Sequence, residues 1–152
     1  MHRTAVIQLL LVLAAACAGS PIAPSNLTVT STPAQGVVKV ESLGVSDVTQ
    51  SALGVWDYTV TAQLRETGGV DVTVTDIQIQ ALVGSTNLAT NSTVPLLPLP
   101  AHSTRQTGLV FETAIHADVS ALTVNITVQF IDANGNAGSI RESFSGFGYW
   151  DY

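Results

Sequence analysis

Residues Leu122–Phe130, with the sequence LTVNITVQF, give the clearest indication of the fold. Every second residue in it is apolar, and the residues between them are Thr, Asn, Thr and Gln. A period of two places the two sets of side chains on opposite faces of an extended strand. The stretch is therefore predicted to be an antiparallel strand with one face in a core and the other in water.

Similar runs lie on both sides of this stretch. Residues 56–65 and 109–115 alternate in the same way, and residues 140–144 close the set. Within residues 70–83 the apolar phase slips, because Val70, Val72 and Val74 are followed by Ile77, Ile79 and Ala81. A change of phase inside one run indicates a β-bulge, or a strand that changes sheets, near Thr75-Asp76.

Turn signals separate these runs. Gly68-Gly69 marks one turn, and Asp132–Asn136 (DANGN) has the Asn and Gly residues that hairpin turns require. The DANGN stretch has a slight likeness to a calcium loop, but the further ligands are missing, so the hairpin is favoured. Residues 84–103 are polar and then Pro-rich, and are predicted to form a crossover with one weak strand.

No stretch after the first 17 residues has a convincing helical period. About seven strands in roughly 115 residues predict an all-β fold, an antiparallel β-sandwich. Residues 37–146 resemble the immunoglobulin-like modules of bacterial surface proteins, through a penultimate strand that runs into Asp132-x-x-Gly135-Asn136 and a final strand. The Cys…Trp…Cys core of antibody domains is absent, so the resemblance is to the broad architecture.

Composition restricts the function. The chain has 152 residues, with 11 Asp and Glu against 5 Lys and Arg, which argues against a nucleic-acid partner. A single Cys excludes an intramolecular disulfide and a Cys-based zinc finger.

The N-terminal residues are predicted to be a targeting signal. Residues 5–16 are uncharged and apolar, which is too short for a membrane span but suits the apolar region of an export signal. The sequence Leu13-Ala14-Ala15-Ala16-Cys17 resembles the lipobox of bacterial lipoproteins, although Ala14 departs from the more usual branched residue. The alternative is a plain secretory signal in which Cys17 is incidental.

The lipobox resemblance implies cleavage after Ala16, so that residues 1–16 are a signal peptide. It also implies a diacylglycerol thioether and an N-acyl chain on Cys17, which hold the protein on a membrane of the cell envelope. The chain from Cys17 onward has 4 − 11 = −7 side-chain charges and is repelled by anionic lipid. In Gram-negative lipoproteins, Asp at the position after the lipidated Cys favours retention in the inner membrane. By the same resemblance, Ala18 at this position implies that the protein is located in the outer membrane if the host is Gram-negative.

Residues 17–36 are predicted to be the lipidated Cys and a tether. They are rich in Ser, Thr, Ala, Gly and Pro, and Pro21, Pro24 and Pro33 favour extended forms. A short edge strand is predicted within the tether at Leu27–Thr30.

No catalytic or metal-binding motif is present. His102 and His116 lie in predicted loops without the spacing of metal ligands, and are interpreted as solvated. Copper is disfavoured because the chain after Cys17 contains no Met. No cofactor and no enzymatic activity are therefore expected.

The C-terminal tail, residues 147–152, is rich in aromatic residues. Phe147, Tyr149, Trp150 and Tyr152 are candidates for a contact site, because aromatic rings stack on sugars and anchor protein interfaces. The alternative, slightly favoured, is that the tail packs on its own sandwich.

The leading functional hypothesis is a lipid-anchored, non-catalytic module that binds or scaffolds a protein or polysaccharide of the envelope. A freely secreted adhesion domain is the second hypothesis. A small envelope enzyme or metal carrier is the third.

Overall fold

The computed structural model describes residues 33–148, and these fold into eight strands and one 3₁₀ turn. The strands are β1 (Val38–Ala52), β2 (Val55–Glu66), β3 (Val72–Val83), β4 (Thr86–Thr93), β5 (Leu97–Leu99), β6 (Thr104–Thr113), β7 (Leu122–Asp132) and β8 (Ala137–Ser145), with the turn η1 (Val119–Ala121) before β7. Across these described residues no helix is long and apolar enough to cross a membrane.

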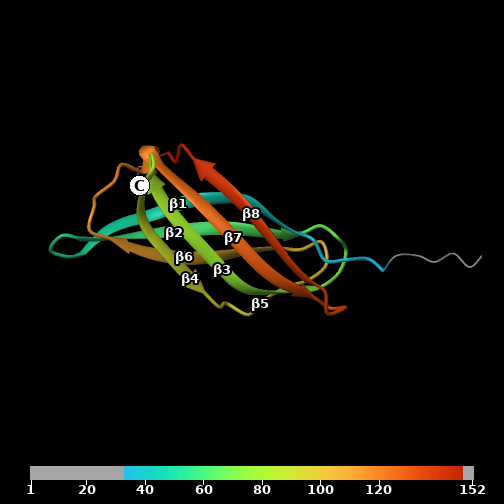
Figure 1. Ribbon diagram of the computed structural model, residues 1–152. Helices are drawn as coiled ribbons and strands as arrows, with labels where there is room; N and C mark the ends of the chain where they lie inside the picture. The colour runs from blue at the N-terminus through green and yellow to red at the C-terminus, as the bar shows by residue number, and fades with distance from the viewer. Residues whose placement is uncertain (1–32, 149–152) are drawn as a thin grey trace, which may run out of the picture. The chain divides into compact units, whose positions relative to one another are not determined.

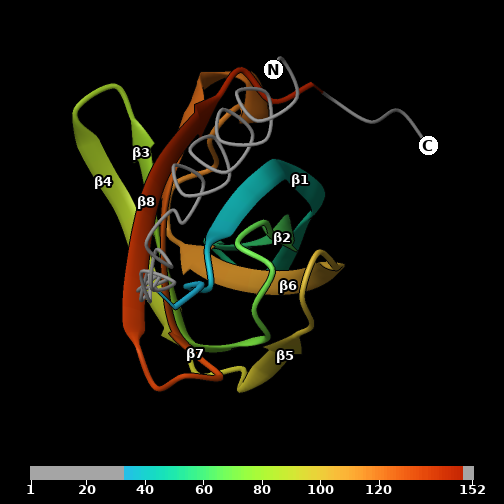
Figure 2. The same ribbon diagram turned by 90° about the vertical axis from the view of Figure 1, so that its right-hand side faces the viewer.

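The strands form two sheets that face each other. One sheet has the order β1-β2-β6, and the other has the order β4-β3-β7-β8, with β5 pairing with β3. All the pairings are antiparallel. Figure 1 shows the strands of one sheet crossing in front of the other, and Figure 2 shows the two layers from the side. The predicted antiparallel β-sandwich is confirmed.

The core lies between the sheets and is formed by the inward phase of each strand. Tyr58 of β2 and Phe111 of β6 stack at its centre, with parallel rings whose centroids are 4.9 Å apart. The residues predicted to be inward on β7, from Leu122 to Phe130, are all buried. Apolar alternation in the sequence therefore translates directly into burial.

The predicted irregularity near Thr75-Asp76 is confirmed as a β-bulge in β3. The register with β7 shifts between Val74 and Asp76, and Ile77 then takes the inward position. Side chains of a strand alternate between its two faces, so the change of apolar phase between Val74 and Ile77 would turn Ile77 outward in a regular strand. The extra residue of the bulge turns Ile77 and the apolar residues after it back toward the core.

Residues 84–103 differ from the prediction of a crossover with one weak strand. They contain two strands, β4 and β5, and both pair with β3. β4 has the sequence TNLATNST, in which no residue is fully buried. An edge strand without a buried face has no apolar alternation, and this explains why the sequence pattern missed it.

The predicted hairpin at DANGN is confirmed. It joins β7 to β8, and Gly135 has the positive φ of 84° that such a turn requires. The Gly135 amide donates to the carbonyl of Asp132, which closes the turn.

Candidate functional site

Glu66 is a fully buried carboxylate at the end of β2. It accepts four backbone hydrogen bonds, from the amides of Gly68 (2.6 Å), Gly69 (2.9 Å), His102 (2.9 Å) and Val37 (3.1 Å). These donors come from three separate segments: the start of β1, the β2–β3 turn and the turn before β6. The side chain thus joins three pieces of backbone at one end of the sandwich.

The pKa of Glu66 reflects this environment. Burial raises the pKa, but the hydrogen bonds from the four backbone amides outweigh it and lower the pKa from 4.5 to about 2. The group is therefore ionised at neutral pH. Its lone pairs are used within the fold, so its role is structural.

Asp132 has an equivalent position at the end of β7. Its carboxylate accepts from the Asn136 side chain (2.9 Å) and from the backbone amides of Asn136 (2.8 Å), Asn134 (2.9 Å) and Gly36 (3.1 Å). The bond from the Asn136 side chain is the largest cause that lowers its pKa, to about 2, against an opposing effect of burial. The carboxylate of the DANGN stretch is thus engaged by its own turn, as the hairpin interpretation expects.

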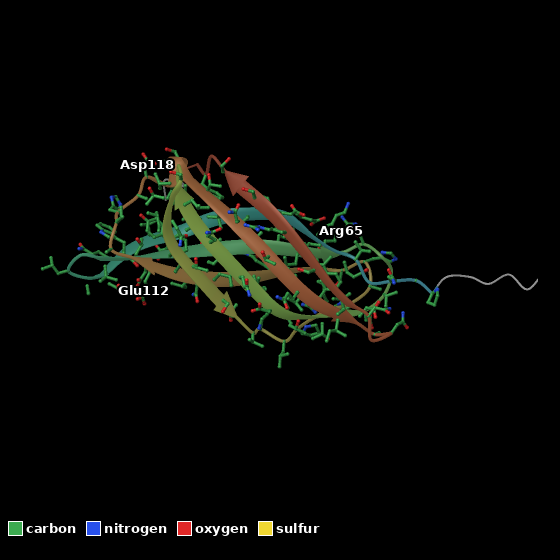
Figure 3. The ribbon with its side chains drawn as sticks, in the orientation of Figure 1. Arg65, Glu112 and Asp118 are labelled. Carbon is green, nitrogen blue, oxygen red and sulfur yellow. The ribbon has the colours of Figure 1, made fainter. Side chains whose placement is uncertain are left out.

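Two further side chains fix the segment that leads into β7. The Tyr58 hydroxyl donates to the Ala117 carbonyl (2.8 Å) and accepts from the Ala117 amide (2.7 Å). Asp118 caps η1 by accepting from the Ser120 amide (2.9 Å) and hydroxyl (2.8 Å), and these bonds lower the pKa of Asp118. Figure 3 labels Asp118 at this end of β7.

The two histidines are exposed and lie in different loops. His102 follows β5. His116 follows β6 and contacts Trp56, with the two rings tilted by 39° and their centroids 4.0 Å apart. Residues 33–148 contain no group of three His, Cys, Asp or Glu side chains placed to hold a metal ion.

The proposed tail site is divided by the structure. Phe147 is buried, with 8% of its surface exposed, and belongs to the core. Tyr149, Trp150 and Tyr152 lie outside the described residues, and so does Cys17. A deletion of residues 147–152 would therefore remove a core side chain together with the other three aromatic residues of the tail.

A polar surface lies on the outer face of the β4-β3-β7-β8 sheet. Two rows of side chains cross it, because the register aligns Thr90, Gln80, Asn125 and Ser143 in one row and Ser92, Gln78, Thr127 and Arg141 in the next. We call these eight residues the amide–hydroxyl face. Within it the Asn125 amide donates to Gln80 Oε1 at 3.2 Å.

This face contains a shallow depression of about 260 Å³, lined by side chains of both rows. Its only ionisable lining residue is Arg141, which makes no ion pair within residues 33–148. The ion pair in the described chain is that of Arg65 with Glu41 (3.0 Å), on the other sheet; Figure 3 labels Arg65. The chemistry of the face is thus that of neutral donors and acceptors with one cation at its edge.

Sequence reasoning identified part of this face. The polar phase of β7 already pointed to Asn125 and Thr127 as outward residues. It could not align them with Gln78, Gln80 and Thr90, because the register between strands is a tertiary property.

Comparisons with known proteins bear on the fold. No family model matches the chain, and no curated protein matches it. An X-ray structure of a Northeast Structural Genomics Consortium target is similar, with a TM-score of 0.53 and 8% identity over 75% of this chain and 87% of that chain. The crystal structure of a candidate ApaA protein from Bordetella pertussis is similar too, with a TM-score of 0.50 and 15% identity over 74% of this chain and 92% of that chain. At such identities the likeness shows the sandwich fold alone.

Proposed function

We propose that this protein is a lipid-anchored, non-catalytic module of the cell envelope that binds a polysaccharide through the amide–hydroxyl face. The observation that carries the proposal is the alignment of eight hydrogen-bonding side chains over four adjacent strands. Strands lie about 4.8 Å apart, so neutral donors and acceptors recur at short intervals across a broad surface. A polymer with many hydroxyl groups matches such a surface.

The same face is less suited to a protein partner. The central part of a protein interface is enriched in aromatic and other apolar side chains. Seven of the eight residues of the face are Ser, Thr, Asn or Gln, and the eighth is Arg141. The chemistry of the surface therefore favours a glycan.

Binding is tested with the double variant Gln80→Ala/Asn125→Ala, assayed against polysaccharides isolated from the host envelope. A net hydrogen bond contributes about 0.5–1.5 kcal/mol, so the loss of two should weaken binding by about 5-fold to 150-fold. The matched control is Gln106→Ala, which removes an exposed amide from β6 of the other sheet. Equal affinity of the double variant and the control would contradict the proposed role of the face.

The anchor is the second part of the proposal, and it rests on the lipobox-like sequence before Cys17. Two or more acyl chains hold a protein stably on a membrane, whereas a single chain does not. We expect Cys17→Ala to move the protein from the detergent-requiring membrane fraction to the soluble fraction. Mass spectrometry of the native N-terminus should show a modified Cys17 as the first residue.

The competing hypothesis of a freely secreted adhesion domain makes the opposite prediction. It expects an unmodified N-terminus and a soluble native protein, and under it Cys17→Ala has no effect on the distribution. This outcome would reject the anchor without affecting the glycan experiment, because the amide–hydroxyl face lies entirely within β3, β4, β7 and β8.

A further inference from the structure

β8 is an edge strand of the β4-β3-β7-β8 sheet. Within residues 33–148 it pairs only with β7, over nine residues and without a register shift. Proteins usually protect such edges with bulges, prolines, lysines or a covering segment. β8 contains no proline and no lysine, and Arg141 is its only basic residue.

The other long edge strands are interrupted or engaged. β1 has three register shifts along its pairing with β2. β4 and β6 are the neighbouring edges of the two sheets, and the Asn91 side-chain amide of β4 donates to the Val110 carbonyl of β6. Among the edge strands that the structure describes, β8 is therefore the longest regular one whose backbone no other edge strand binds.

The open backbone groups of β8 belong to its odd-numbered residues. The Asp132 amide donates to the Asn136 carbonyl at the start of the β7–β8 ladder. In an antiparallel ladder such bonded pairs recur at every second residue. Even-numbered residues of β8 thus bond to β7, whereas the amides and carbonyls of Ser139, Arg141 and Ser143 point away from it.

The side chains of β8 restrict what can lie beside it. On the core side, Ile140 and Phe144 pack against the core but stay only partly buried, and Glu142 between them is partly buried too. On the outer side, the exposed Arg141 lies between two small serines. A neighbouring strand must therefore offer Ile140 an apolar group and must keep like charges away from Arg141 and Glu142.

We propose that β8 pairs with β8 of a second copy of this chain, antiparallel and about a two-fold axis at Ile140. In this register Ile140 lies opposite its own counterpart, Arg141 lies opposite Ser139, and Glu142 lies opposite Gly138. Strand addition of this kind takes its affinity from backbone hydrogen bonds and its specificity from alternate side chains.

The charges of β8 select this register. An axis at Arg141 or at Glu142 would place that charged residue directly opposite its own counterpart, which is destabilising. An axis nearer either end of the strand would leave fewer residues paired. With the axis at Ile140, Ala137 to Ser143 are all paired, and no like charges lie opposite each other. β8 is thus complementary to itself in one arrangement.

The pairing goes beyond the proposed function and depends neither on it nor on the lipid. A two-fold axis between antiparallel edge strands is perpendicular to the sheet, so both copies turn their outer faces to the same side. The two amide–hydroxyl faces then form one continuous surface with Arg141 of each copy near its centre. A long polymer bound to one face meets the second face beside it, which raises its avidity.

The association is measured by sedimentation equilibrium of the purified full chain carrying Cys17→Ala, so that no disulfide through Cys17 contributes. We expect a monomer–dimer equilibrium. Ser139→Lys places like charges opposite Arg141 at two symmetric positions, and Ser139→Glu places opposite charges there. The dissociation constant should therefore rise in Ser139→Lys and fall in Ser139→Glu, each by about 2-fold to 30-fold.

The matched controls are Gln106→Lys and Gln106→Glu, which introduce the same charges at an exposed position on β6 of the other sheet. Both should dimerise with the affinity of the parent chain. Ser139 is itself exposed, and melting temperatures measured in parallel verify that all four variants fold.

Cysteine cross-linking tests the position of the axis. In the same background, Ile140→Cys places two cysteines in a pair that is not hydrogen-bonded, with Cα atoms about 4.5 Å apart, which is within the range of a disulfide. Glu142→Cys is the control, because its two copies would lie about 13 Å apart along the strands. We expect oxidation to join Ile140→Cys and to leave Glu142→Cys as a monomer.

A monomer at every concentration tested would overturn the proposal. Equal dimer affinity of Ser139→Lys and Ser139→Glu would overturn it even if a dimer forms, since the contact would then lie elsewhere on the molecule. Cross-linking of Glu142→Cys without cross-linking of Ile140→Cys would reject the axis at Ile140.

Discussion

Glu66→Gln is expected to destabilise the protein by about 2–4 kcal/mol at neutral pH and to lower the melting temperature by roughly 10 °C or more. The amide that replaces the carboxylate has one acceptor oxygen for four buried backbone donors and carries no charge. Its NH₂ group must also face other N–H groups. The start of β1 and both turns that Glu66 joins would lose their common partner.

The same variant tests the pH dependence. The folded-state pKa of Glu66 is lowered from 4.5 to about 2, so its contribution to stability is fully present above pH 4.5 and is lost as the pH falls toward 2. The wild type should therefore lose stability between about pH 5 and pH 2 more steeply than Glu66→Gln. Asp132, whose pKa is lowered as well, keeps part of the acid sensitivity in both proteins.

The measurement is urea unfolding at pH 7, 5, 4 and 3. Glu41→Gln is the matched control, because Glu41 makes only an exposed ion pair with Arg65, and such pairs contribute about 0–1 kcal/mol. The structural role assigned to this carboxylate is wrong if Glu66→Gln unfolds at the same urea concentration as the control. It is also wrong if the loss of unfolding free energy relative to the wild type is the same at every pH.

Tyr58→Ala is expected to lower the free energy of unfolding by about 3–5 kcal/mol, which is more than the loss expected for Glu66→Gln. The reason is that it leaves a cavity beside Phe111 in the centre of the core. Tyr58→Phe keeps the ring and removes only the hydroxyl. It leaves the amide and the carbonyl of Ala117, itself buried, without the partner they share, at a cost of about 1–3 kcal/mol.

The two Tyr58 variants separate packing from hydrogen bonding. Chemical denaturation gives the free energy of unfolding of each, and hydrogen exchange reports the Ala117 amide directly. We expect that amide to exchange faster in Tyr58→Phe even under conditions where the protein stays folded. Unchanged exchange at Ala117 together with unchanged stability would show that the hydroxyl does not hold the β6–β7 connection.

Both structural acids, Glu66 and Asp132, can be recognised in the sequence. The inward phase of β2 runs from Trp56 to Leu64, and its next position is Glu66, followed by Gly68-Gly69. The inward phase of β7 likewise ends at Asp132, which is the first residue of the DANGN turn. A carboxylate in the apolar phase, directly before a turn, has nearby backbone amides to accept from. That pattern is a signal for a buried structural acid.

Local sequence patterns were sufficient to predict the all-β class, the inward face of β7, the bulge in β3 and the last hairpin. Each of these follows from local rules: the period of two, a slip in its phase, and the residues that accept positive φ. Three features became visible only in the folded chain: β4 and β5 pair with β3, Phe147 belongs to the core, and Gln80 lies beside Thr90 and Asn125. Pairing between strands depends on contacts between residues far apart in the chain, and no local pattern of side chains encodes which strands become neighbours.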